Sequence, residues 1–187
     1  MDIQDYYQKA INFAGKHHAD QNIPGSNTSY MVHLSNVAME ILVAGQHSSD
    51  SYREDFDYKF AVQLALLHDL LEDTSTTFDE IKEEFGQNIA RGVLALSKNE
   101  ALAPSQQIIE SLSRIKLEPK EVWAVKLADR ISNLQKPPAH WDMNKIIEYH
   151  KMAGIILLQL KGGNAYLENR LYQKIIDYKE FMPVASS

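Results

Sequence analysis

The amino-acid sequence predicts an all-α fold, a compact single-domain bundle of about eight helices that spans residues 1–187. Three observations lead to this prediction. Apolar residues recur at the three- and four-residue spacing of a helix along most of the chain, and no segment alternates convincingly in the manner of a strand. Capping residues and Gly or Pro stop signals fall between the apolar runs. The length fits one domain with a sizeable hydrophobic core.

The first part of the chain predicts three long helices. Asp2 can cap a helix through residues 3–14, and a polar loop that contains Gly and Pro follows at residues 21–29. A second helix covers about residues 30–44. The third, at about residues 56–71, is apolar nearly all round, which is typical of a central and buried helix.

The rest of the chain predicts helices separated by clear stop signals. Thr77 and Glu80 form a capping box, and Gly86 ends the short helix that the box starts. Pro119 suits the first turn of a helix that stops before the double proline at residues 137–138. The remaining predicted helices cover residues 89–97, about 105–114, 143–160 and 164–181, with Gly162 and Gly163 between the last two.

The composition excludes several classes of protein. The chain contains no cysteine, so disulfides, zinc–thiolate sites and thiol nucleophiles are excluded. A net charge of −6 argues against a nucleic-acid polymer as partner, although a small anionic substrate can still fit. No apolar run is long enough to span a membrane, and the acidic, polar N-terminus lacks a secretion signal. We therefore expect a cytoplasmic protein without a membrane partner, and a homo-oligomer is left open.

Ionisable residues occur at the end of an apolar helix and suggest a metal site. His68 and Asp69 follow an apolar run, where burying an ionised carboxylate beside an imidazole is costly unless a partner neutralises it. A divalent cation is such a partner. Glu72 lies three residues after Asp69, on the same helical face, and Asp73 follows it. We expect Glu72 or Asp73 to orient and deprotonate a water molecule beside the metal.

Two further candidate ligands come from separate helices. His33 lies early in the second predicted helix, and Asp129 is a charged residue within the apolar helix that starts at Pro119. Imidazole with carboxylate ligands suits Mn²⁺, Fe²⁺, Co²⁺, Ni²⁺ or Zn²⁺ better than Ca²⁺. Four protein ligands on a six-coordinate ion leave positions for water and substrate, as hydrolysis requires. The predicted cofactor is therefore one divalent metal ion.

These candidate ligands resemble the signature of a known family. The chain matches the H…HD…D pattern of the HD superfamily of metal-dependent phosphohydrolases, in order, at His33, His68, Asp69 and Asp129. A His-Asp dipeptide alone is not informative, whereas three blocks in the expected order are specific. The resemblance implies the all-α HD-domain fold, with one hydrolase domain over residues 1–187.

The flanking sequence resembles one branch of this superfamily, the RelA/SpoT-type alarmone hydrolases and their small stand-alone members. The resemblance extends from about residue 6 to residue 178, and three blocks carry it. They are residues 30–33 (YMVH), 65–86 (ALLHDLLEDTSTTFDEIKEEFG) and 125–134 (VKLADRISNL). This branch implies a Mn²⁺-dependent 3′-pyrophosphohydrolase that acts on guanosine tetra- and pentaphosphate.

The resemblance also implies a role for each matching residue. The metal ligands would be His33, His68, Asp69 and Asp129. Glu72 and Asp73 would be the pair that activates the attacking water. Asn133 would contact the nucleotide sugar or base, Lys126 is a candidate phosphate contact, and Tyr30 is a candidate substrate contact.

One segment departs from the pattern of this branch. The branch usually carries a basic pair before its Tyr-x-x-His, in the loop that holds the guanine base, whereas residues 22–29 contain no Arg or Lys. Ser29 and Leu34 replace the prolines usually found beside the Tyr and after the His. Two alternatives therefore stay open. One is a different HD enzyme, such as a nucleoside 5′-monophosphate phosphatase, and the other is a nucleotide-binding module with little turnover.

Overall fold

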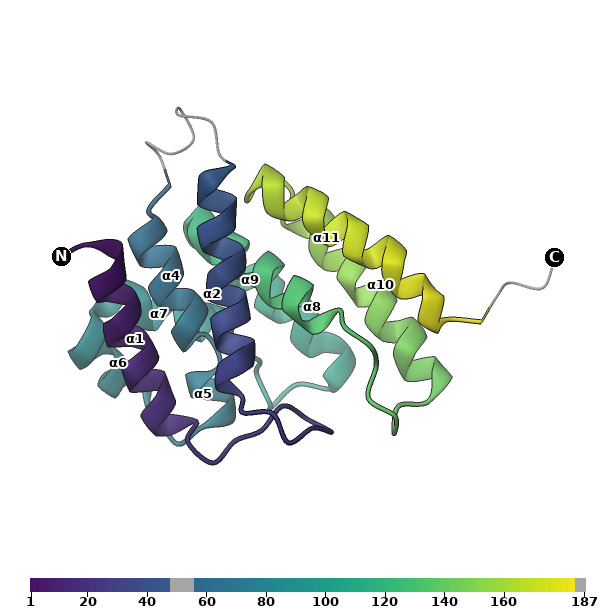
Figure 1. Ribbon diagram of the computed structural model, residues 1–187, viewed down its shortest axis with the longest axis horizontal. Helices are drawn as coiled ribbons and strands as arrows, with labels where there is room; N and C mark the ends of the chain where they lie inside the picture. Colours follow the sequence, from purple (N-terminus) through teal and green to yellow (C-terminus); the bar gives the residue numbers. More distant parts are fainter. Residues whose placement is uncertain (48–55, 184–187) are drawn as a thin grey trace.

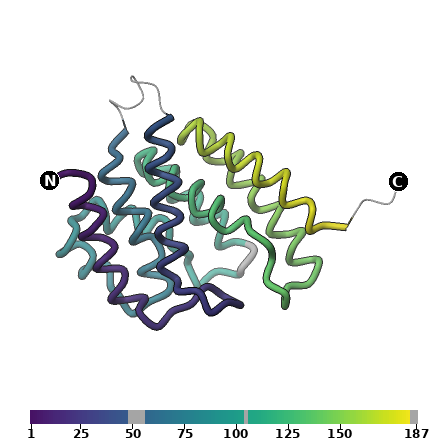
Figure 2. Tube along the Cα trace, in the orientation of Figure 1, coloured from purple at the N-terminus to yellow at the C-terminus, as the bar shows by residue number. Residues whose placement is uncertain are grey.

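Helices make up nearly all of the regular structure in the computed structural model, which describes residues 1–47 and 56–183 (Figure 1; Figure 2). Apart from one isolated β-bridge between Asn22 and Ser29, no strand occurs in these ranges. The all-α prediction is confirmed. The helices are α1 (Ile3–His17), α2 (Met31–Gln46), α4 (Tyr58–Leu67), α5 (Leu70–Asp73), α6 (Phe78–Phe85), α7 (Gln87–Leu96), α8 (Pro104–Ile115), α9 (Lys120–Asn133), α10 (Met143–Gln159), α11 (Ala165–Asp177) and the 3₁₀ helix η1 (Tyr178–Phe181).

Several helices begin and end where the sequence supplies caps. The Asp2 N–H donates to the Asp5 carboxylate at 2.8 Å at the start of α1. The predicted capping box of α6 is confirmed, because the Thr77 N–H donates to Glu80 Oε2 at 2.7 Å and the Glu80 N–H donates to Thr77 Oγ1 at 3.3 Å. Gly86 separates α6 from α7 and has a φ of +89°. Residues with a Cβ atom rarely adopt this backbone conformation. These local signals set the boundaries of the short helices.

Helix α4 lies at the centre of the bundle, as its apolar sequence predicts. Every residue from 61 to 67 is buried, and the helix packs against α1, α2, α7 and α9. The close approach of α7 depends on Gly92, because a Cβ at that position would lie 2.6 Å from Leu64 Cδ2. The charged residues that follow α4 are thus held next to the hydrophobic core.

The prediction of one continuous helix over residues 56–71 is wrong at its C-terminal end. Helix α4 ends at Leu67, and α5 begins only at Leu70. Between them Asp69 has φ −99° and ψ 0°, outside the α-helical values. The hydrophobic pattern did not reveal this break because leucines on both sides of it keep helical spacing.

Helices α10 and α11 lie side by side next to α9 and away from α1 (Figure 1). Helix α11 also reaches α2, where the Arg170 guanidinium donates to both carboxylate oxygens of Glu40 at 2.7 and 2.9 Å. Helix α9 therefore packs against α2 and α4 as well as against the C-terminal pair. Within the described ranges, no helix is long and apolar enough to cross a membrane.

Candidate metal centre

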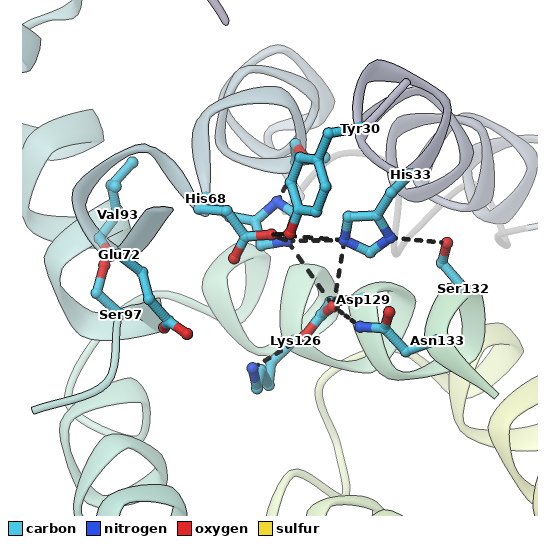
Figure 3. A network of polar contacts seen from close by, with 12 residues as sticks. Tyr30, His33, His68, Glu72, Val93, Ser97, Lys126, Asp129, Ser132 and Asn133 are labelled. Carbon is cyan, nitrogen blue, oxygen red and sulfur yellow. Dashed lines mark hydrogen bonds and ion pairs between the residues drawn. The ribbon is translucent and has the colours of Figure 1, made fainter. Parts of the chain in front are cut away.

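The four predicted ligand residues meet where α2, α9 and the junction between α4 and α5 come together, and Figure 3 labels three of them, His33, His68 and Asp129. His33 lies in the first turn of α2, and Asp129 lies in the second half of α9. His68 follows the last residue of α4, and Asp69 precedes the first residue of α5. The packing of three separate parts of the chain against one another thus creates the cluster.

The nitrogen and oxygen atoms of these side chains converge on one point. His33 Nε2 and His68 Nε2 are 3.4 Å apart, and Asp129 Oδ1 lies 3.6 and 3.8 Å from them. Asp69 Oδ2 lies 3.0 Å from His68 Nε2 and 3.5 Å from His33 Nε2. Ligand atoms about 2.1 Å from one ion lie about 3 Å apart. The spacing of the four side chains is therefore close to what a shared cation requires.

Hydrogen bonds on the far side of each imidazole ring orient the histidines. His68 Nδ1 lies 2.8 Å from the Ala65 carbonyl oxygen, which can only accept, so Nδ1 carries a proton. His33 Nδ1 lies 3.1 Å from Ser132 Oγ. Both rings consequently turn Nε2 toward the cluster. Such contacts set the tautomer of a metal-binding histidine and hold its ring in position.

The charges in the cluster attract a cation. Burial lowers the pKa of His68, but attraction to Asp69 and hydrogen bonds to Asp129 and Asp69 outweigh this effect and raise the pKa to about 10. Burial opposes ionisation of Asp69, yet His68 and His33 hold the pKa of that carboxyl well below its usual range. Lys126 and His68 likewise lower the pKa of Asp129 against the effect of burial. Both carboxylates therefore stay ionised, although Asp129 is buried and Asp69 is half-buried.

A divalent metal ion fits this donor set. One atom each from His33, His68 and Asp129 lie within 4.8 Å of one another, and all three residues are buried. Two imidazole nitrogens with carboxylate oxygens are the ligands that first-row transition metals prefer. Asp129 is buried and Asp69 is half-buried, so the two carboxylates need a positive charge beside them, which a divalent ion coordinated by neutral imidazoles supplies.

Three residues expected to contact substrate donate hydrogen bonds to the carboxylates of the candidate ligands. The Tyr30 hydroxyl donates to Asp69 Oδ2 at 2.5 Å. On α9, Lys126 Nζ donates to Asp129 Oδ2 at 2.9 Å, and Asn133 Nδ2 donates to Asp129 Oδ1 at 2.5 Å. These contacts fix the direction in which each carboxylate points. Contact of the same residues with a substrate stays a prediction.

Glu72 and Asp73 lie in α5, next to the cluster. Lys98 holds both carboxylate oxygens of Glu72, since its N–H donates to Oε2 at 3.0 Å and its ammonium donates to Oε1. Asp73 is accessible to solvent. Desolvation and the charge of Asp69 raise the Asp73 pKa, against hydrogen bonds from Tyr30 and Gln21. A raised pKa makes this carboxylate a stronger base.

The break between α4 and α5 explains how two consecutive residues can face one point. In a continuous helix, successive side chains diverge by about 100° around the axis. His68 keeps helical angles, whereas Asp69 leaves them with ψ 0°. The two side chains thereby converge until His68 Nε2 and Asp69 Oδ2 are 3.0 Å apart.

Sequence reasoning missed several residues that support the site. Ser132, the partner of His33, lies one turn after Asp129 on the same face of α9, and this spacing could have revealed it. The buried ring of His18 stacks on Tyr30 with 5.1 Å between ring centroids. Lys98 lies 26 positions from Glu72 in a polar segment, so no local pattern could have identified it.

The loop without basic residues folds into a small hairpin. Its ends pair through the bridge of Asn22 with Ser29, and the Ile23 N–H donates to the Thr28 carbonyl at 2.8 Å. Gly25 has a φ of +77°, and a Cβ there would lie 3.5 Å from Pro138 Cβ. The loop therefore lies against the segment that follows α9, next to the end of the helix that carries Asp129.

The Tyr30→Phe substitution is expected to weaken binding of a divalent metal ion at this site about tenfold, because it removes a hydrogen bond that orients Asp69 and retains the ring that stacks on His18. Calorimetric titration with Mn²⁺ measures the change. The matched control is Tyr172→Phe, which alters a tyrosine that is 53% exposed on α11. Equal Mn²⁺ affinity in Tyr30→Phe and the unsubstituted protein would contradict the orienting role.

A family comparison agrees with this geometry. The model of the HD domain family matches residues 10–147, a range that includes all four candidate ligands together with Glu72 and Asp73. The chain belongs to the HD domain family. The match covers more than half of the chain and contains every helix that contributes to the metal centre.

Two curated relatives of this HD domain protein resemble it over about nine-tenths of their length. It is 28% identical to guanosine-3′,5′-bis(diphosphate) 3′-pyrophosphohydrolase MESH1 of Danio rerio, over 90% of this chain and 92% of that protein. For the Homo sapiens protein of the same name the identity is 29%, over 87% and 89% of the two chains. The solved structure of a metazoan ortholog of SpoT that hydrolyses ppGpp superposes with a TM-score of 0.77 at 23% identity, covering 92% and 94% of the two chains. The chain thus has the HD-domain fold and is homologous to these proteins.

Proposed function

We propose that this HD domain protein is a metal-dependent phosphohydrolase, a 3′-pyrophosphohydrolase of guanosine 3′,5′-bis(diphosphate) (ppGpp), with residues 1–187 as one hydrolase domain. The observation that carries the proposal is the buried cluster around His33 and His68 with two further carboxylates, Glu72 and Asp73, beside it. Similarity over nine-tenths of the chain to proteins that bear this activity in their names supports the choice of substrate.

The proposed cofactor is one Mn²⁺ ion held by the Nε2 atoms of His33 and His68 and by the carboxylates of Asp69 and Asp129. A bound divalent ion lowers the pKa of water and neutralises charge on phosphate oxygens. Fe²⁺, Co²⁺, Ni²⁺ and Zn²⁺ accept the same kinds of ligand atom, so the ligand set alone does not select Mn²⁺.

Glu72 and Asp73 are assigned the proton chemistry. The water oxygen bonds to the phosphorus attached to O3′, and the water gives a proton to one of the two carboxylates. The O3′–P bond then breaks, the protonated carboxylate returns its proton to O3′, which becomes a hydroxyl group, and pyrophosphate leaves. Asp73 suits the role of base because desolvation and Asp69 raise its pKa.

Three residues that hold the ligand carboxylates still have hydrogen-bonding capacity for a substrate. Asn133 uses one N–H on Asp129, and its amide has a second N–H and a carbonyl oxygen for the nucleotide sugar or base. The Lys126 ammonium has two N–H groups beyond the one that contacts Asp129, which suits a phosphate oxygen. We assign Tyr30 to the edge of the same substrate site.

Turnover of a nucleotide panel tests the proposal. With Mn²⁺ present, we expect pyrophosphate to be released from ppGpp, and chelation of the metal should abolish the release. Nucleoside 5′-monophosphates serve as the comparison substrates. Faster orthophosphate release from them would favour a nucleoside 5′-monophosphate phosphatase and contradict the proposal. Tight ppGpp binding without product over hours would instead identify a nucleotide-binding module.

A further inference from the structure

In the contact between Glu72 and Lys98, one residue donates hydrogen bonds to both oxygens of a proposed catalytic carboxylate. The Lys98 N–H binds Oε2 at 3.0 Å, and the Lys98 ammonium binds Oε1. The side chain of Glu72 is 16% exposed, whereas that of Lys98 is 47% exposed. A substrate that arrives from solvent can therefore reach Lys98 more readily than Glu72.

The two parts of this contact differ in how firmly they are held. Arg114 fixes the main chain before Lys98, because its guanidinium donates to the Ser97 carbonyl at 2.6 Å and also to the Leu94 carbonyl. The N–H of Lys98 is therefore a rigid donor to Glu72. Its four-carbon side chain has no such restraint and can swing while the N–H contact stays in place.

The charges around the site make Lys98 suitable for an anion. Partial burial lowers the pKa of Lys98, but the hydrogen bond to Glu72 and the charges of Glu72, Asp69 and Asp129 together outweigh this effect and raise the pKa. The ammonium thus lies within the field of the metal centre. Lys126, by contrast, is buried and forms an ion pair with Asp129. The loop at residues 22–29 carries no basic residue. Lys98 is a half-exposed cation beside the proposed water-activating pair.

We propose that Lys98 binds a phosphate group of the substrate and leaves Glu72 to do so, which frees Glu72 Oε1 to accept the proton of the attacking water. The main-chain N–H of Lys98 keeps Glu72 Oε2 in place during the exchange. Substrate binding and activation of Glu72 are thereby coupled through one side chain. This inference rests on the proposed phosphohydrolase function.

The Lys98→Met substitution separates the two parts of the contact, because it removes the ammonium and keeps the main-chain N–H. We expect KM for ppGpp to rise about tenfold, because a factor of about ten corresponds to the loss of one hydrogen bond to a charged group. We expect kcat to stay within about twofold of the value for the unsubstituted protein. Lys98→Arg should restore most of the affinity. A fall in kcat with an unchanged KM would overturn the proposal, because it would mean that Lys98 only positions Glu72.

Lys9→Met is the matched control. Lys9 also pairs with a glutamate, Glu84, at 3.0 Å, and its side chain is 40% exposed, so the variant loses the same charge from a similar contact on α1. We expect its KM and kcat to match those of the unsubstituted protein. An equal rise of KM in Lys9→Met would overturn the proposal, since it would reflect only the net charge.

A binding measurement distinguishes failure of this inference from failure of the proposed function. Inorganic pyrophosphate is titrated calorimetrically into each protein in excess Mn²⁺, which requires no turnover. We expect Lys98→Met to bind pyrophosphate about tenfold more weakly than Lys9→Met does. Equal binding, or no binding by the unsubstituted protein, would overturn the role of Lys98. Lack of ppGpp hydrolysis would count against the proposed function alone.

Discussion

Replacing His68 by alanine is expected to abolish Mn²⁺ binding and ppGpp hydrolysis together. The substitution removes the Nε2 atom that lies within 3.0–3.8 Å of His33, Asp69 and Asp129 ligand atoms, and it leaves the two carboxylates with His33 as their remaining imidazole partner. Loss of a group that only orients a metal ligand costs about 10–100-fold in affinity or activity. Loss of a ligand itself should therefore cost on the order of 10³-fold or more in activity.

Two measurements check this expectation. Calorimetric titration gives the Mn²⁺ affinity, and pyrophosphate release from ppGpp gives the activity. The control is His47→Ala, which changes an exposed histidine after α2 that stacks on Tyr166 and lies outside the cluster. Normal metal affinity in His68→Ala would show that the metal binds elsewhere.

The Glu72→Gln substitution is expected to retain Mn²⁺ and reduce kcat by about 10²- to 10⁴-fold, the usual contribution of a general base. The glutamine amide keeps the shape of the side chain, and its carbonyl oxygen can still accept from the Lys98 N–H. It cannot take a proton from water. Metal affinity should stay unchanged because the contacts of Glu72 are with Lys98 and not with the candidate ligands.

The matched control for this substitution is Glu84→Gln, because Glu84 also pairs with a lysine and lies on the surface at α6. Rate constants for ppGpp and Mn²⁺ affinities are compared between the two variants. If Glu72→Gln keeps its rate and Asp73→Asn loses it, then Asp73 alone handles the proton and the role assigned to Glu72 is wrong.

The sequence was sufficient to predict the helices and the buried position of α4, because hydrophobic spacing and capping residues act locally. The break after Leu67 escaped prediction because it depends on packing at His68 and Asp69, which face the cluster together. Leucines continue at helical spacing across the break, so the pattern alone indicates one helix.

The same contrast applies to the site. Asp129 stood out because a charge inside an apolar helix needs a partner, and its position beside the two histidines agrees with that reasoning. Lys98 gave no such signal, since a lysine in a polar segment between helices is ordinary. Its contact with Glu72 joins positions 26 residues apart and appears only once α5 and α7 are packed together.

The assembly of the candidate metal centre from α2, α9 and the α4–α5 junction would link metal supply to folding. His33 and its partner Ser132 are 99 positions apart, so a peptide fragment or an unfolded chain cannot offer the same arrangement of ligands. A ligand that binds only the native state stabilises it by mass action, by about 2.7 kcal/mol when its free concentration is 100 times the Kd. The lifetime of the folded protein in a cell would then follow the concentration of free transition metal around it, as well as the packing of its own core.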